Sequence, residues 1–246
     1  MDNLKTKFGK RKVNEKDKTS LVQSVFSEVS QKYDLMNDFM SLGNHRIWKK
    51  NLIDLMNIQN NDIIVDVGSG TGDLIDLMIK KKKFIHAYSL DLNKKMLIHG
   101  QKKILKDKIT NVNFINANAE NIPFNNDFFD KYVISFCLRN ITYINKALDE
   151  SYRILKPGGV FYCLEFSSPS SNLVKWIYSN YKSKIIPYLG KKIAKNHGAY
   201  KYLEESISQF PNQDTLLNQL NKVGFVNSSY INLFNGIVCI HKGYKA

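Results

Sequence analysis

A glycine-rich segment, VDVGSGTGD over residues 65–73, carries the residue types that form a ligand-binding loop. Its glycines repeat as G-x-G-x-G, at Gly68, Gly70 and Gly72. Glycine is needed where the backbone turns sharply against a ligand that leaves no room for a Cβ atom. A dinucleotide fingerprint has a different spacing, G-x-G-x-x-G, and aims a helix N-terminus at a pyrophosphate. Because carboxylates repel a phosphate and favour a cation, the flanking Asp66 and Asp73 indicate a cationic ligand.

Two polar segments further along the chain have the residue types to bind a nucleoside. Asp91, in SLDLN, ends the next predicted strand, 23 residues beyond Gly68. A carboxylate at this place can accept two hydrogen bonds from ribose hydroxyls. The alternative is that Asp91 only caps the following helix. Asn118, Ala119 and Glu120 follow a later strand end and could frame an adenine ring.

Short apolar strands and helices alternate from residue 62, and these elements must position the polar loops. Strand patterns occur over residues 62–68, 84–92, 112–119, 130–138 and 160–167. Helical patterns lie between them, over residues 71–81, 94–106 and 144–155, the last followed by the helix stop Lys-Pro-Gly-Gly. Strands that alternate with helices predict an α/β fold with a mostly parallel sheet and helices on both faces.

Both ends of the chain depart from this alternation. Apolar spacing predicts a helix from Thr19 and a second helix over His45 to Met56. After residue 167 an aromatic-rich helical insertion follows, and then a helix over residues 214–225. The C-terminal segment holds two strand patterns around Asn235-Gly236, a strong signal for an antiparallel hairpin.

Neither an internal repeat nor a low-complexity linker divides the sequence, so we expect one domain with additions. We divide it into a basic flexible tail (1–18), an N-terminal helical lid or acceptor segment (19–57) and a core (58–246). The core carries the helical insertion, at about residues 168–207.

Composition limits the kinds of site and partner. Lys and Arg total 36 against 22 Asp and Glu, a net charge of +14. Because the Lys residues are spread widely, a solvated surface is favoured over a nucleic-acid stripe, and an anionic membrane surface stays open. Cys137, Cys163 and Cys239 lie apart in apolar segments, which predicts buried thiols in a reducing compartment and no metal site. No run of about 18 apolar residues and no secretory signal is present.

Residues 60–165 resemble the class I S-adenosylmethionine methyltransferases. The acidic strand end, the ribose carboxylate and the LKPGG turn occur in the order found in that class. The resemblance implies a Rossmann-like, seven-stranded sheet and S-adenosylmethionine as the methyl donor. It also implies the donor-binding residues: Asp66, Gly68, Gly70, Thr71, Gly72, Asp91, Asn118, Ala119 and Ser135. NIPF differs from the N-P-P-Y loop of amino-methylating enzymes at Ile122, so transfer to an exocyclic amine is not supported.

Two longer motifs resemble the ubiquinone/menaquinone biosynthesis C-methyltransferases. YDLMNDFMSLGNHRIW, residues 33–48, has the Tyr-Asp, Met-Asn, Ser, His and Trp of that family, and RILKPGGVFYCLEFS, residues 153–167, resembles its second signature. The resemblance covers almost the whole chain from Phe8. It implies transfer of a methyl group to a ring carbon of a reduced polyprenylated benzoquinol or naphthoquinol. The reduced ring is a competent carbon nucleophile once a phenol is deprotonated, and no metal is needed.

The residues that handle the acceptor's proton are less sharply marked. Arg139 and Asn140 follow a strand end, and we expect Arg139 to stabilise a phenolate or hold a water, since a guanidinium hardly deprotonates. Arg139 could instead cap a helix or pair with Asp149. His45 is a candidate base, or a packing residue beside Trp48. The candidates for acceptor binding are Tyr33, Met36, Asn37 and Tyr200.

One segment departs from the family pattern. Where the family carries acidic residues before a Tyr-Arg-Tyr, AKNHGAYKYL has Asn196, Gly198, Ala199 and Lys201. If those acids help to position the quinol, this chain positions it differently, or its substrate ring or tail differs.

Two segments are available to bind the acceptor and its surroundings. Met36, Phe39, Met40 and Trp48 either line an apolar lid for an isoprenoid tail or pack against the sheet edge. The insertion, with Trp176 and many Lys, fits a peripheral contact with the inner face of the membrane by a cytoplasmic protein, or an interface with a partner protein. A homodimer and membership of a quinone-synthesis complex also stay open.

The high positive charge keeps one alternative activity in view, a methyltransferase that acts on RNA or protein. A second alternative is a non-catalytic, donor-binding member of a quinone-synthesis complex. We favour the quinol methyltransferase, with a polyprenylated quinol as partner and no nucleic acid.

Overall fold

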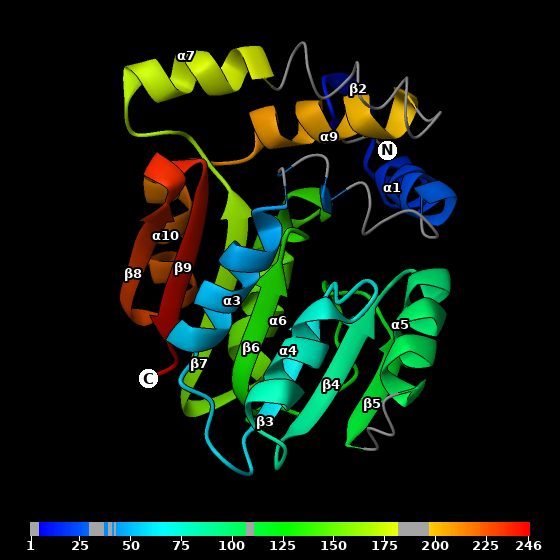
Figure 1. Cartoon of the computed structure of the whole chain (residues 1–246), viewed down its shortest axis with the longest axis vertical. Coiled ribbons are helices and arrows are strands. Elements are labelled where there is room, and N and C mark those ends of the chain that lie inside the picture. The colour runs from blue at the N-terminus through cyan, green and yellow to red at the C-terminus, as the bar shows by residue number, and fades with distance from the viewer. Residues whose placement is uncertain (1–4, 30–36, 39–40, 42, 107–110, 182–196) are drawn as a thin grey trace.

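Seven strands form the central sheet of the molecule. The computed structural model describes residues 5–29, 37–38, 41, 43–106, 111–181 and 197–246. The strands are β3 (Ile63–Val67), β4 (His86–Asp91), β5 (Val112–Asn116), β6 (Phe129–Ser135), β7 (Leu155–Phe166), β8 (Val226–Leu233) and β9 (Val238–Tyr244). Their order is β5-β4-β3-β6-β7-β9-β8 (Figure 1). The pairs among β3 to β7 are parallel, and β9 is antiparallel to both of its neighbours, so the predicted α/β sheet with a C-terminal hairpin is confirmed.

The order of the strands in the sheet, compared with their order along the chain, creates a crevice. From β3 it proceeds outward to β4 and β5, and then it returns to place β6 on the other side of β3. The connections that leave the carboxyl ends of β3 and β6 therefore diverge. In open α/β sheets, ligands bind at such a switch point.

Helices cover both faces because successive side chains of a strand point to opposite sides. Ile64 packs with buried side chains of α3 (His45–Leu55) and α4 (Asp73–Lys81). Val65 packs with those of α6 (Ile144–Ile154) and α10 (Gln213–Val223). Helix α5 (Lys94–Lys106) packs along β4 and β5. Asp66 shares the face of Ile64, so its carboxyl lies on the side of α3 and α4.

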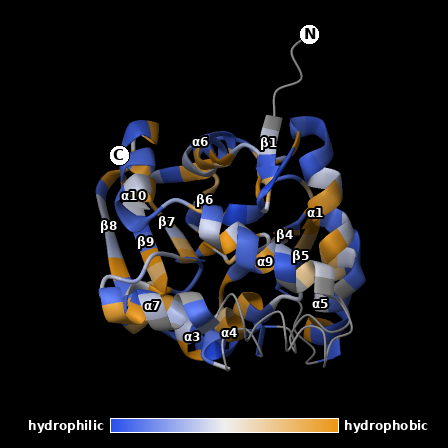
Figure 2. Cartoon of the chain, turned by 90° about the horizontal axis from the view of Figure 1, so that it is seen from above, coloured by the Kyte–Doolittle hydropathy of each residue, from blue (hydrophilic) through white to orange (hydrophobic). Residues whose placement is uncertain are grey.

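A second layer crosses the carboxyl end of the sheet. It contains α1 (Glu15–Val29), α7 (Asn172–Asn180) and α9 (His197–Gln209). Seen from above, α9 crosses the middle, with α1 and α7 on its two sides (Figure 2). Helices α7 and α9 belong to the predicted insertion, and residues 182–196 between them lie outside the described residues.

The N-terminal segment corrects the expectation of a flexible tail. β1 (Lys5–Phe8) and β2 (Arg11–Asn14) form an antiparallel hairpin, and α1 begins at Glu15 rather than Thr19. An isolated hairpin is marginal in water, so it needs contacts from elsewhere. Helix α9 supplies them: Phe8 stacks on Tyr202 with ring centroids 4.4 Å apart, and the Lys10 N–H donates to Glu205 Oε2 at 3.1 Å.

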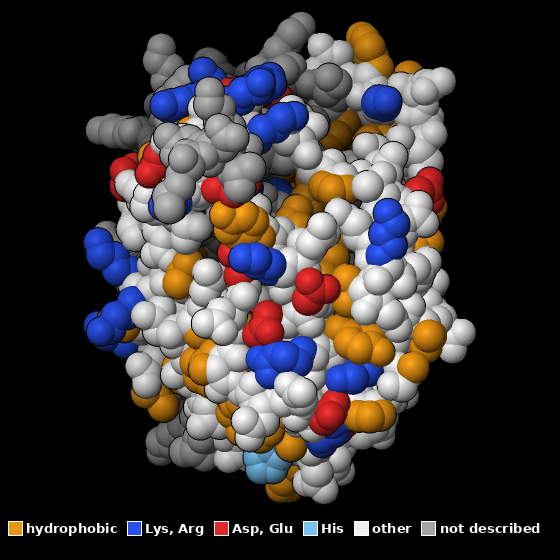
Figure 3. Space-filling model, turned by 180° about the vertical axis from the view of Figure 1, so that it is seen from behind, with side chains coloured by type: hydrophobic (Ala, Val, Ile, Leu, Met, Phe, Trp, Pro, Cys, Tyr) orange, Lys and Arg blue, Asp and Glu red, His pale blue; other side chains and the backbone are white. Residues whose placement is uncertain are grey.

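No helix in the described part of the chain is long and apolar enough to cross a membrane. On the face drawn in Figure 3, Lys and Arg lie among acidic, apolar and other side chains. The three cysteines are free thiols; Cys163 and Cys239 are buried as expected, but Cys137 is only half-buried. Cys137 packs at the border of the core.

Candidate active site

The glycine loop follows β3 and packs against the end of β4. Gly68 and Gly70 have φ angles of 69° and 57°, which favour glycine. The Gly68 N–H donates to the Leu90 carbonyl at 2.7 Å, and a Cβ atom on Gly68 would collide with the Cys137 side chain. The loop is therefore closed tightly on both sides, and only glycine fits at residue 68.

Asp91 holds the loop in this conformation. Its Oδ2 accepts from the Gly70 N–H at 2.9 Å, and its Oδ1 accepts from the Asn93 N–H at 2.7 Å. Burial raises the pKa of Asp91, and these two N–H groups oppose that rise. The cap of α5 is supplied by Asn93, whose Oδ1 accepts from the N–H groups of Lys95 and Met96 at 3.1 and 3.2 Å. Asp91 is thus not the helix cap, and each of its oxygens keeps a further lone pair for a ligand.

A cleft of about 760 Å³, the main cleft, opens beside this carboxylate. The predicted residues that line it are Gly68, Gly70, Asp91, Asn118, Ala119 and Asn140. Helix α1 provides the opposite wall, and Asn93 Nδ2 ties it to the end of β4 by donating to the Gln23 carbonyl at 3.2 Å and to Ser27 Oγ at 2.9 Å. Cys137 also lines the cleft. The cleft therefore lies between the carboxyl end of the sheet and helix α1.

The turn at residues 118–120 is fixed from within. Asn118 Oδ1 accepts from the Glu120 N–H at 3.0 Å. Glu120 Oε1 accepts from the N–H groups of Thr142 and Tyr143, both at 3.1 Å, which joins this turn to the loop after β6. The predicted adenine-binding turn is consequently held by the same loop that carries Arg139 and Asn140.

A smaller space of about 360 Å³, the loop cavity, adjoins the main cleft at Gly68, Gly70 and Phe136. Its other predicted lining residues are Asn37, Asp66, Thr71 and Ser135. Asp66 Oδ2 and Ser135 Oγ are buried and have no hydrogen-bond partner among the described residues. Burial raises the pKa of Asp66 to about 8. Gly72 lines neither space, because it lies at the N-cap of α4.

Asp73 corrects one part of the sequence interpretation. Its carboxylate pairs with Lys49 at 2.8 Å and with Lys103 at 2.7 Å. Burial alone would raise its pKa, but the two ammonium groups hold the pKa of Asp73 well below the ordinary range. Since its charge is already balanced, Asp73 does not supply the negative charge expected beside a cationic ligand.

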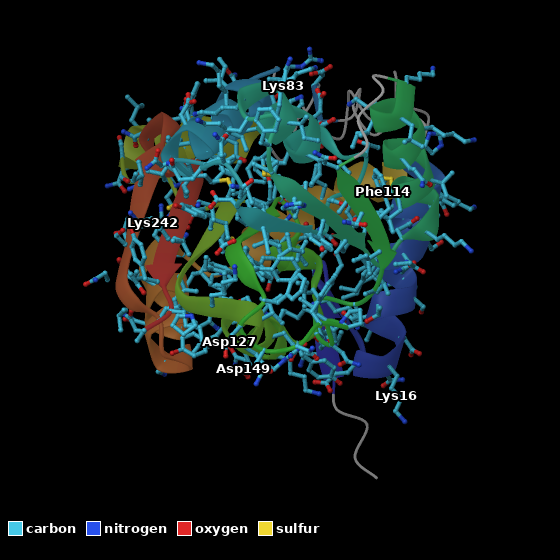
Figure 4. All side chains as sticks on the ribbon, turned by 90° about the horizontal axis from the view of Figure 1, so that it is seen from below. Lys16, Lys83, Phe114, Asp127, Asp149 and Lys242 are labelled. Carbon is cyan, nitrogen blue, oxygen red and sulfur yellow. The ribbon has the colours of Figure 1, made fainter. Side chains whose placement is uncertain are left out.

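Arg139 is held by a carboxylate that the sequence interpretation did not name. Its Nη1 donates to Glu165 Oε1 at 2.7 Å and to the Phe136 carbonyl at 2.6 Å, and both members of this ion pair are buried. The suggested pairing with Asp149 is wrong: that side chain is exposed on α6, at the periphery of the molecule in the view of Figure 4. Arg139 lies beside the main cleft without lining it.

The space that Arg139 does line, the hairpin cavity of about 420 Å³, is shared with Lys7, Lys18 and Tyr202. The Tyr202 hydroxyl donates to Asn140 Oδ1 at 3.0 Å. Because Asn140 lines the main cleft, this hydrogen bond connects α9 to the main cleft.

His45 lies at the start of α3 and lines none of these three spaces. It is 5% exposed, and its Nε2 lies 2.8 Å from Asp38 Oδ1. Burial lowers the pKa of His45, although the hydrogen bond to Asp38 opposes this. A part in catalysis stays a prediction for this residue.

Several acceptor-binding candidates cannot be placed. Tyr33, Met36, Phe39 and Met40 lie outside the described residues, and so does Asn196 of the segment that departs from the family pattern. Tyr200 lies on α9, but its side chain is not described. Trp48 is 3% exposed and packs edge-on against Phe166 and Phe234, which supports the packing alternative for this residue.

The side chains in or beside these spaces that were not predicted include Lys49, Glu165 and Tyr202. Lys49 had a visible signal, because it lies four residues after His45 and three before Leu52, on the buried stripe of a predicted helix. Glu165 also had one, as a charge within the apolar strand FYCLEF. Tyr202 had none beyond its aromatic character, since its partners are distant in the sequence.

Comparison with known proteins gives a consistent result. The model of the ubiE/COQ5 methyltransferase family matches residues 10–245. The ubiquinone/menaquinone biosynthesis C-methyltransferase UbiE of Rickettsia prowazekii is 46% identical over 246 residues, which cover 98% of both chains. The proteins of the same name from Pectobacterium atrosepticum and Methylococcus capsulatus are 43% and 41% identical, and each alignment covers at least 96% of both chains.

Solved structures share the fold at low sequence identity. An S-adenosylmethionine-dependent methyltransferase from Aquifex aeolicus aligns with a TM-score of 0.61 and 14% identity, covering 80% of this chain and 89% of that one. Phosphoethanolamine N-methyltransferase 2 of Haemonchus contortus, in complex with S-adenosylmethionine, aligns with a TM-score of 0.60 and 14% identity, covering 80% and 52%. These two likenesses concern the fold alone.

Proposed function

The chain belongs to the ubiE/COQ5 methyltransferase family, and we propose that it methylates a ring carbon of a reduced polyprenyl benzoquinol or naphthoquinol in ubiquinone and menaquinone biosynthesis, with S-adenosylmethionine as donor. The observation that carries this proposal is the identity of 46% along 98% of a relative of that name. The donor site supports it, because the glycine loop, Asp91 and the 118–120 turn meet at one cleft.

The residues present fit S-adenosylmethionine. Asp91 offers free lone pairs to ribose hydroxyls at the end of β4, and the turn at Asn118 and Ala119 lies where the adenine would follow. Asp66 Oδ2 and Ser135 Oγ are buried polar atoms that lack a partner within the described structure. When bound, S-adenosylmethionine supplies an electrophilic methyl group on a sulfonium. The chain's own task is to bind the donor, orient the acceptor and exclude water.

The acceptor needs two kinds of help from the protein. Its ring carbon must lie in line with the methyl group, and such positioning is worth roughly 7–11 kcal/mol of barrier. Its phenol must lose a proton, and assistance with that step contributes typically about 10²–10⁴-fold. A reduced ring meets both needs, because it is electron-rich and carries the phenolic hydroxyl.

We propose that the loop after β6 binds the phenolic oxygen of the acceptor. The Asn140 amide, which lines the main cleft and is fixed by Tyr202, orients that oxygen, and the Arg139 guanidinium, held beside the cleft by Glu165, favours negative charge on it from behind Asn140. Arg139 keeps its charge at any ordinary pH, so the proton itself leaves to another base or to water. His45 is the alternative base, and Tyr33, Met36, Asn37 and Tyr200 are the proposed contacts with the acceptor.

The experiment for this proposal is complementation of a bacterial strain that lacks this methylation step. With the protein present, the extracted quinones should gain 14 mass units, one methyl in place of one hydrogen. Unchanged quinone masses in a strain that produces the folded protein would contradict the proposal. The Asp91→Ala variant should fail to complement; if it complements fully, the chain acts as a non-catalytic component.

We also propose that α7 contacts the membrane surface, where a polyprenyl tail would enter. Leu173 and Trp176 are 66% and 68% exposed, and their spacing of three places them on one side of the helix. Aromatic side chains sit at headgroup level, and the net charge of +14 is attracted to anionic lipid. In Figure 1, α7 lies at the outer edge of the layer above the sheet.

The two Trp residues allow a direct test of this contact. Trp48 is 3% exposed and Trp176 is 68% exposed, so a change in emission on mixing with vesicles reports Trp176. Vesicles with anionic lipid should shift the emission to the blue and sediment the protein, and Leu173→Ser should weaken both effects. Unshifted emission and no sedimentation would contradict the contact.

A further inference from the structure

Lys49 is a charged side chain on the buried face of α3. The residue is 8% exposed and lies on the same face as Leu52 and Ile53, which are in the core. Lys is almost never buried unless its charge is matched, because removal of an ammonium from water is costly. The position of Lys49 therefore calls for oxygen partners.

The described residues satisfy only part of this ammonium group. Lys49 Nζ donates to Asp73 Oδ2 at 2.8 Å, and this is its only hydrogen bond within the described structure. An ammonium has three N–H donors, so two remain, and Lys49 lines the loop cavity. Asp73 also pairs with Lys103, which leaves these three side chains with a net charge of +1.

The loop cavity also contains oxygen atoms that could bind a cationic group. Asp66 and Ser135 line the same space, and both have buried side-chain oxygens without a hydrogen-bond partner among the described residues. An ammonium placed beside Asp66 would offset the burial that raises the pKa of this carboxyl to about 8. The cavity thus matches a small zwitterion, with a carboxylate near Lys49 and an ammonium near Asp66 and Ser135.

The two spaces adjoin along the glycine loop, and this points to the identity of the zwitterion. Gly68, Gly70 and Phe136 line both the main cleft and the loop cavity. With the adenosine of a donor at Asp91 and Asn118 in the main cleft, the amino-acid end of the same molecule extends along the glycine loop into the loop cavity.

We propose that Lys49 binds the α-carboxylate of S-adenosylmethionine, which leaves Asp66 and Ser135, donor-binding residues that the family resemblance already implies, to face its α-ammonium. This inference rests on the donor part of the proposed function and does not depend on the acceptor. It gives α3, which precedes the glycine loop in the sequence, a direct part in donor binding.

The test is a cycle of two proteins and two ligands measured by calorimetry. The ligands are S-adenosylhomocysteine and its decarboxylated form, which lacks only the carboxylate. Lys49→Met keeps the apolar stem of the side chain and removes its charge. We expect Lys49→Met to weaken S-adenosylhomocysteine by about 10- to 100-fold, the range for hydrogen bonds to charged groups, and the decarboxylated ligand by less than about threefold.

Lys103→Met is the matched control, because it also removes a partner of Asp73 but Lys103 does not line the loop cavity. It should change the affinity for either ligand by less than about threefold, and Lys49→Arg should restore part of the lost affinity. Equal weakening of both ligands by Lys49→Met, or the same loss in Lys103→Met, would overturn the proposal. If the unchanged protein binds neither ligand, the donor site fails and Lys49 with it; if it binds them but methylates no quinol, only the acceptor assignment fails.

Discussion

The two sides of the main cleft are held together by different kinds of contact. On the sheet side, carboxylates at strand ends shape the site by accepting from backbone N–H groups, as where Asp91 accepts from Gly70 and Asn93. On the side of the loop after β6, the site depends on contacts between pairs of side chains. Arg139 pairs with Glu165, and Asn140 accepts from Tyr202, 62 residues away.

This difference separates what short motifs encode from what the fold assembles. A glycine loop and a carboxylate at a strand end come together whenever the two strands that they follow are parallel neighbours in the sheet. The loop after β6, by contrast, is completed by α9 and α1, which come from the two additions to the core. We expect changes on the sheet side to affect donor affinity most, and changes on the other side to affect stability and turnover.

The largest effect on stability should come from Glu165→Ala. Removal of one partner from a buried ion pair leaves an uncompensated charge and costs about 3–5 kcal/mol. Urea unfolding followed by circular dichroism measures this loss. The matched control is the double variant Arg139→Met with Glu165→Leu, which should recover much of the stability but no turnover. A loss below about 1 kcal/mol for Glu165→Ala would show that the ion pair does not hold this side together.

Asp91→Ala should cause the largest loss of donor affinity. The change removes the oxygens that face ribose and those that hold the Gly70 and Asn93 N–H groups. We expect S-adenosylhomocysteine to bind about 100-fold more weakly, equal to about 2.7 kcal/mol, as measured by calorimetry. Asp91→Asn, which keeps one accepting oxygen, should lose about tenfold. Binding by Asp91→Ala within threefold of the unchanged protein would remove Asp91 from the donor site.

Asp66 should make stability depend on pH. Its pKa is raised by burial from an ordinary value of 3.8 to about 8, so the folded state keeps the proton that the unfolded chain releases near pH 4. The resulting stabilisation is complete below about pH 4 and is lost as pH rises through 8. Asp66→Asn, neutral at every pH, should therefore gain about 2 kcal/mol relative to the unchanged protein between about pH 6.5 and 8.5. Parallel stability curves for the two proteins would contradict a neutral Asp66 in the folded state.

Tyr202→Phe should have the smallest effect. The change removes the hydrogen bond to Asn140 but keeps the ring that stacks on Phe8. Loss of one neutral hydrogen bond costs about 1 kcal/mol, which thermal unfolding can resolve. Phe8→Leu is the complementary variant, since it keeps the hydroxyl and removes the stacking. An unchanged melting temperature for Tyr202→Phe would indicate that Asn140 is held by other contacts.

Much of the fold follows from the sequence because its signals are local. Apolar runs that end in glycine or Asp91 predicted the parallel strands, and Asn235-Gly236 predicted the C-terminal hairpin, which is present as β8 and β9. The N-terminal hairpin could not be predicted in this way, because residues 5–14 are mostly polar and pair only where α9 supports them.

The residues of the site also fall into those that local sequence signals predict and those that they do not. The donor-side residues could be predicted because they follow strands that lie next to one another in the sheet. The partner of Arg139 could not, because an exposed Asp149 and a buried Glu165 are equally acidic in a sequence, and only the register of β6 beside β7 brings Glu165 close. Lys49 could have been found from its place on an apolar helix stripe, but its link with Asp73 requires the packing of α3 against α4.

The most direct test of the proposed activity is methyl transfer by the purified protein from methyl-labelled S-adenosylmethionine to a demethylated polyprenyl quinone. The quinone is kept reduced in one sample and oxidised in another. Label should enter a ring carbon of the reduced lipid, and the oxidised lipid should stay unlabelled because its ring is a poor nucleophile. Equal labelling of both samples, or label found only in water-soluble acceptors, would contradict the assignment of this chain as a quinol C-methyltransferase.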